Sequence, residues 1–141
     1  QDKHDTITRL INYNLKTLNI IGYSDYKNTT VLFSILSSLD IIIDILKNAA
    51  RDIIEVKMKL GPKALTILNK IHESIKLHYE LFYNFSFDKA EKFIYSRNEI
   101  TDTIKKQIND LSKNDVRILV MVQQTLEVLR DIYSSRMAMQ Y

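Results

Sequence analysis

Four carboxylates draw attention because the same spacing occurs in two distant parts of the chain. Asp40 and Asp44 are four residues apart, and Glu127 and Asp131 repeat that spacing. Residues four apart lie on one face of an α-helix, so each pair would stack two carboxylates about one turn apart. Carboxylate oxygens are ligands for hard cations, so these residues could bind iron or another divalent or trivalent metal.

A plain polar strip is the alternative interpretation, because many helix faces carry two carboxylates. Lys47 and Arg51 follow Asp40 and Asp44 by seven residues and could offset the repulsion within that pair. A metal would also need more ligands than one pair provides. Further oxygen ligands would have to come from residues on the same or neighbouring helices, namely Asn48, Asp102 and Asp5. Both interpretations remain open from the residues alone.

The carboxylate pairs belong to a longer internal repeat. Residues 38–48 match residues 125–135 as hydroxyl, apolar, carboxylate, apolar, carboxylate and small polar positions, and residues 5–12 match residues 102–109. A helix pair therefore occurs twice in the chain. Such a repeat indicates the architecture before any single motif does.

Apolar periodicity predicts an all-α protein with no competing strand signal. Gly22 is a natural helix stop, Gly61-Pro62 is the clearest break, and Ser86 or Asp88 can cap a helix. On helix 63–85, apolar residues recur at helical spacing, at Leu65, Leu68, Ile71, Ile75, Tyr79 and Phe82. The predicted helices cover residues 2–21, 28–59, 63–85, 89–111 and 115–139.

Two units follow from the repeat and the break. Residues 61–141 make a three-helix bundle, whereas residues 1–60 supply only two helices of a matching bundle. An upstream segment of the same protein or another subunit would provide the missing third helix. The absence of a starting methionine suggests a piece of a longer chain. Ile41 and Ile45 lie off the main apolar stripe, so we expect an interface there and an oligomer instead of a lone monomer.

Composition narrows the function classes. The 141 residues contain no cysteine, which excludes zinc–thiolate sites and suits a reducing, cytoplasmic compartment. The net charge is only +3, and positive and negative residues alternate along the chain, so the composition does not indicate a nucleic-acid-binding surface. No uninterrupted apolar run approaches the ~20 residues of a membrane span. His72 and His78 read as surface or boundary residues, and the aromatic cluster of residues 79–87 as packing or, less often, partner docking.

The repeat resembles the PhoU family of phosphate-uptake regulators. Its phrase of hydroxyl, apolar and carboxylate residues stands here as Ser38-Leu39-Asp40-Ile41-Ile42-Ile43-Asp44 with Asn48, and as Thr125-Leu126-Glu127-Val128-Leu129-Arg130-Asp131 with Ser135. The approach at residues 87–102 also looks like that family. The chain departs from the usual phrase at Ile41, Ile43, Val128 and Arg130, as a degenerate or truncated member would.

The resemblance implies tandem three-helix bundles of PhoU type, with the first bundle lacking its first helix. It further implies a non-enzymatic regulator that contacts the cytoplasmic component of a phosphate transporter or a sensor kinase and can hold iron or a similar metal. The alternative is a metal-binding helical bundle unrelated to phosphate control, such as a di-iron oxidoreductase. Neither carboxylate pair has the histidine at +3 that di-iron bundles use, so we favour the regulator.

Overall fold

The computed structural model describes residues 2–24, 26–57 and 59–138, and it is all-α over these ranges. The described residues form five α-helices and two short 3₁₀ segments, with no strand. In chain order the elements are α1 (Asp2–Ile21), η1 (Tyr26–Asn28), α2 (Thr29–Glu55), α3 (Pro62–Tyr83), α4 (Phe87–Gln107), η2 (Ile108–Asp110) and α5 (Lys113–Ala138).

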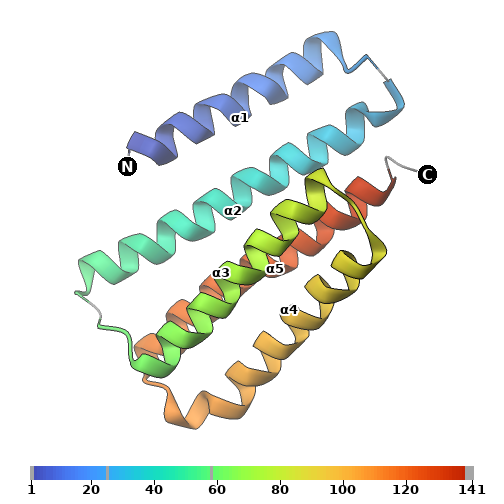
Figure 1. Ribbon diagram of the computed structural model, residues 1–141. Helices are drawn as coiled ribbons and strands as arrows, with labels where there is room; N and C mark the ends of the chain where they lie inside the picture. Colours follow the sequence, from blue (N-terminus) through green and yellow to red (C-terminus); the bar gives the residue numbers. More distant parts are fainter. Residues whose placement is uncertain (1, 25, 58, 139–141) are drawn as a thin grey trace.

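The helices are arranged as a bundle with one outlying member. Figure 1 shows α1 at one edge, α2 beside it, and α3, α4 and α5 grouped on the other side of α2. The most extensive contact joins α2 to α5, the two helices that carry the repeated carboxylate pairs. Helix α3 packs on both α4 and α5, whereas α1 packs substantially on α2 alone.

The core lies where α2, α3, α4 and α5 meet. Ile35 and Ile42 of α2 reach it, and its largest fully buried side chain is Phe93 of α4. By length and mean hydropathy, α2 is the one helix in the described ranges that could cross a membrane, and core helices of bundles share those properties.

Most helix limits agree with the sequence-based expectation. Helix α1 has the predicted bounds and ends at Gly22, whose φ of 76° is left-handed and whose N–H donates to Leu18 at 3.0 Å. Ser86 caps α4 by accepting from the Lys89 N–H. The predicted limit of α5 at Met139 lies outside the described residues.

Helix α2 ends earlier than predicted, at Glu55 instead of residue 59. The reason is Lys57, whose φ of 49° is left-handed and turns the chain out of the helix. Its N–H still donates to Ile54 at 3.2 Å. Helix α4 likewise gives way to the 3₁₀ segment η2 before residue 111.

The apolar stripe expected on α3 lies only partly in the core: Ile71 is buried, and Leu68, Ile75 and Phe82 are partly buried against the core. Leu65 and Tyr79 are exposed, and the helix buries a neighbouring stripe made of Ala64, Ile67, Ile71, Ser74, His78 and Leu81. This stripe contains small residues, which allow α4 and α5 to approach closely. His78, expected at a surface or boundary, is therefore buried, while His72 is exposed.

Candidate functional site

The first carboxylate pair lies at the contact of α1 and α2. Asp44 is exposed and Asp40 is half-buried. The Oδ1 atom of Asp44 lies 3.1 Å from Lys47 Nζ and 3.2 Å from His4 Nε2. Hydrogen bonds from Lys47 and then His4 lower the pKa of Asp44. This carboxylate is therefore already held by cationic or donating side chains of its own chain.

His4 joins two carboxylates through opposite edges of its ring. Its Nδ1 lies 3.1 Å from Asp5 Oδ1, and its Nε2 faces Asp44. Because the two ring nitrogens point in different directions, the two carboxylates do not converge on one point. Sequence reasoning had overlooked His4, since its approach to α2 depends on how α1 and α2 are aligned. Together with Lys47, Asp5 and Ile7, it lines an open hollow at the α1–α2 contact.

The second carboxylate pair lies on α5 beside α4. Glu127 accepts two hydrogen bonds from Arg97, one from Nε at 2.9 Å and a second from Nη2. Arg130 lies 3.5 Å from Glu127 and 3.3 Å from the exposed Asp131. A bidentate guanidinium is the side-chain group that best matches a carboxylate, so Arg97 occupies the position at Glu127 that a cation would take. Sequence reasoning had overlooked Arg97.

The further oxygen ligands that the sequence suggested do not complete either pair. Asn48 and Asp102 are exposed. Beside the second pair, the Arg97 guanidinium also donates to Asn98, at 2.8 Å. Within residues 2–24, 26–57 and 59–138, no three His, Asp or Glu side chains converge to hold a metal ion. A metal at either pair would have to displace a cationic side chain. Metal binding by the pairs stays a prediction.

A buried carboxylate lies elsewhere, where α3 and α5 begin. Asp115 accepts from the Gly61 N–H at 2.9 Å and from the Ser112 N–H and hydroxyl at 3.0 and 2.8 Å. Burial alone would raise the pKa of Asp115, but these hydrogen bonds outweigh it and lower that pKa. The Ser-x-x-Asp spacing is a capping box that sequence reading could have found. Its role is structural, because it ties the α2–α3 connection to α5.

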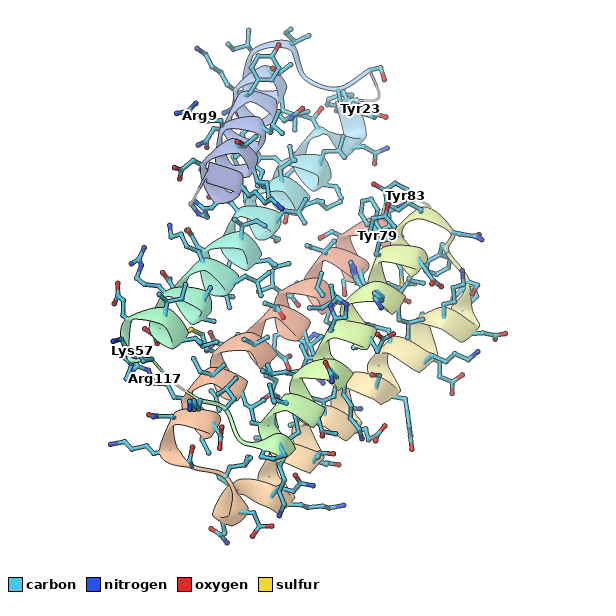
Figure 2. The ribbon with its side chains drawn as sticks, turned by 60° about the vertical axis from the view of Figure 1, so that its left-hand side comes forward. Arg9, Tyr23, Lys57, Tyr79, Tyr83 and Arg117 are labelled. Atoms are coloured by element: carbon cyan, nitrogen blue, oxygen red, sulfur yellow. The ribbon has the colours of Figure 1, made fainter. Side chains whose placement is uncertain are left out.

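Exposed aromatic side chains gather at the α3–α4 turn. Tyr79 and Tyr83 are 64% and 70% exposed, and their ring centroids lie 4.9 Å apart. Figure 2 shows them next to each other at the end of α3. Phe87, at the start of α4, is also exposed and packs on Phe85. We call Tyr79, Tyr83 and Phe87 the aromatic end.

Comparisons with known proteins add no relative. No family model, no curated protein and no solved structure matches the chain.

Proposed function

We propose that the chain is a non-enzymatic, cytoplasmic regulator of phosphate uptake that acts through protein–protein contacts, with the cytoplasmic component of a phosphate transporter as its partner. The transporter part of the proposal comes from the sequence resemblance to the PhoU family. The contact part is carried by one structural observation, the aromatic end.

The aromatic end has the properties of a docking surface. Tyrosine and phenylalanine are enriched in interface cores, because they bury a large area at low conformational cost. Tyr79 and Tyr83 project from one end of a helix whose opposite face is fixed in the core by His78 and Leu81. The backbone that carries the two rings is thus fixed before any partner arrives, which reduces the ordering cost of binding.

The packing of α2 on α5 also supports the proposal. These are the two helices that carry the repeated phrase, and they form the most extensive contact of the fold. Their carboxylates are held by Lys47, His4, Arg97 and Arg130. That arrangement suits a stable platform that presents surfaces to a partner.

Binding of the purified chain to the purified transporter component tests the proposal, with a sensor kinase as the second probe. Tyr79→Ala combined with Tyr83→Ala should weaken transporter binding at least about tenfold, as expected when interface hot spots are truncated. Tyr95→Ala is the matched control, since Tyr95 is 70% exposed on α4 and lies outside the aromatic end. Binding to the kinase alone would replace the proposed partner, and binding to neither probe would overturn the function.

A further inference from the structure

A largely exposed stripe of three apolar and two polar residues runs along α1 with coiled-coil spacing. Its members follow one another at intervals of three, four, three and four residues, and they are Ile7, Leu10, Asn14, Thr17 and Ile21. This is the spacing of a and d positions in a heptad. Leu10 is 58% exposed, and Ile7 and Ile21 are also exposed. The side of α1 that packs on α2 adjoins this stripe and is marked by the buried Ile11. Ile7 lies at the boundary between them, where it lines the hollow at the α1–α2 contact.

Helix α2 continues this stripe into a wider apolar face. Leu39 and Leu46, seven residues apart, are each 38% exposed. Leu46 lines the same hollow as Ile7 of α1, so the two flanks lie on one side of the helix pair. We call Ile7, Leu10, Asn14, Thr17 and Ile21 with Leu39 and Leu46 the seam face.

The internal repeat shows what this face lacks. Ile7 corresponds to Ile104, and Leu39 corresponds to Leu126. Ile7 and Leu39 are both 38% exposed, whereas Ile104 and Leu126 are 4% and 0% exposed, in the core with residues of α3. A helix therefore covers the second copy of this pattern, while the first copy is uncovered.

We propose that α1 of a second copy of this chain covers the seam face, so that two α1–α2 pairs form a symmetric four-helix contact. Each α1 would then cover the helix pair of the other copy, as α3 covers α4 and α5 within the second unit. The members of the seam face are uncharged, but the hollow that contains Ile7 and Leu46 is bordered by charged side chains of both signs, namely Asp5, Lys47, Arg51 and Glu55. Two are acidic and two are basic, so neither sign is in excess: two copies can meet without net like-charge repulsion, and the face does not select an acidic or a basic partner.

Asn14 favours a second copy in particular. A single asparagine at an a position sets register and the number of strands in coiled coils, because it pairs with its equivalent across the seam. Asn14 stands midway between Ile7 and Ile21, and its amide at present donates to the Leu10 carbonyl at 2.8 Å. Its side chain is exposed and can turn toward a partner asparagine.

The available area is sufficient for a dimer. Helix α1 has 20 residues and is therefore ~30 Å long. Two adjacent helices each ~10 Å wide give a face of ~600 Å² per copy, or ~1,200 Å² in total, at the lower end of stable specific interfaces. We therefore expect a dimer that dissociates on dilution. This inference does not depend on the proposed function.

Light scattering from ~1 to ~100 µM tests the dimer. The wild-type mass should rise toward twice the 16.6 kDa of one chain, and Leu10→Glu with Leu39→Glu should raise the dissociation constant at least about tenfold. Asn12→Glu is the control, because Asn12 is exposed on the side of α1 opposite the seam face. A mass of one chain throughout, or a dimer that the seam variants leave unchanged, would overturn the inference.

Cysteine cross-linking keeps the inference testable if a glutamate variant does not fold. The chain has no cysteine, so a single introduced thiol reports on its own position. Asn14→Cys should form a disulfide-linked dimer under mild oxidation, whereas Asn12→Cys, on the opposite side of α1, should not. Equal cross-linking of the two variants, or none in Asn14→Cys, would contradict the seam.

Discussion

At the residue scale, a buried histidine makes stability depend on pH. His78 is 6% exposed and contacts the Phe93 ring at a centroid distance of 5.3 Å. Burial lowers its pKa from 6.5 to about 4, against a smaller opposing effect of a hydrogen bond to the Leu129 backbone. The unfolded chain therefore binds more protons than the folded chain between pH 6.5 and 4, so stability falls as the pH falls through that window.

We expect acidification from pH 7 to pH 5 to cost the wild type about 2 kcal/mol more than it costs His78→Leu. Urea unfolding at both pH values measures this difference. His72→Leu is the control, because His72 is exposed on the same helix. An equal loss in the wild type and in His78→Leu would show that His78 is not the group that titrates.

Asp115 is buried at the start of α5, and its replacement should be the most costly among the helix-capping residues. The Asp115 carboxylate accepts one hydrogen bond from Gly61 and two from Ser112, and it uses both of its oxygens to do so. Asp115→Asn retains only one acceptor oxygen, so at least one of these donors would lose its partner. We expect a loss of about 1–3 kcal/mol in a urea titration at pH 7. Because the pKa of Asp115 is lowered, this stabilisation is present above the ordinary carboxyl pKa and is lost as the pH falls through the folded value.

Asp110→Asn is the matched control for that variant. Asp110 forms an exposed ion pair with Lys63 at 2.6 Å, and exposed pairs contribute only ~0–1 kcal/mol. If Asp115→Asn were no more destabilising than Asp110→Asn, the hydrogen bonds to Gly61 and Ser112 would not stabilise the start of α5 as argued.

Metal binding by the carboxylate pairs can be decided by calorimetry. If the pairs bind metal, titration of the wild type with ferric or divalent ions should give a binding heat. That heat should be lost in the double variant Asp44→Asn, Asp131→Asn. Arg97→Gln should strengthen binding at Glu127, because it removes the guanidinium that holds this carboxylate. Identical heats for all three proteins would leave the pairs as surface charge.

At the element scale, the early end of α2 stores backbone strain. Lys57 has a φ of 49°, in the left-handed region that glycine adopts without a steric cost. Figure 2 shows it near Arg117, which lies 2.7 Å from Asp52 of α2. Lys57→Gly should stabilise the chain by about 1 kcal/mol in thermal or urea unfolding. Lys59→Gly is the control, and stabilisation by both variants alike would point to lost charge instead of relieved strain.

The same elements show what sequence reading can and cannot reach. Gly22 and Gly61-Pro62 marked helix ends correctly, because their chemistry acts locally. The end of α2 before Lys57 could not be predicted in this way, since a lysine has no preference for a left-handed turn. Leu65 and Tyr79 of the apolar stripe on α3 are exposed, because two neighbouring stripes are apolar and only the packing of α4 and α5 selects between them. The pairing of Glu127 with Arg97 depends on the alignment of α4 against α5, which periodicity does not contain.

At the scale of the whole molecule, the helices should differ in local stability. Helix α1 packs substantially on α2 alone, and Ile11, which is 6% exposed, is its one buried side chain in the described part. Helix α5 contacts α2, α3 and α4, and Ile118, Leu119 and Leu126 are completely buried on it. Opening α1 therefore breaks few contacts, whereas exposing the amides of α5 requires the bundle to come apart.

Hydrogen exchange measured by mass spectrometry at ~1 µM should find the amides of α1 exchanging at least about tenfold faster than those in the middle of α5. Raising the concentration to ~100 µM should slow exchange in α1 and leave α5 unchanged, because a second copy covers the seam face. In the Leu10→Glu, Leu39→Glu variant the concentration dependence should disappear. Protection of α1 equal to that of α5 in the dilute sample would mean that contacts other than those with α2 hold this helix in place.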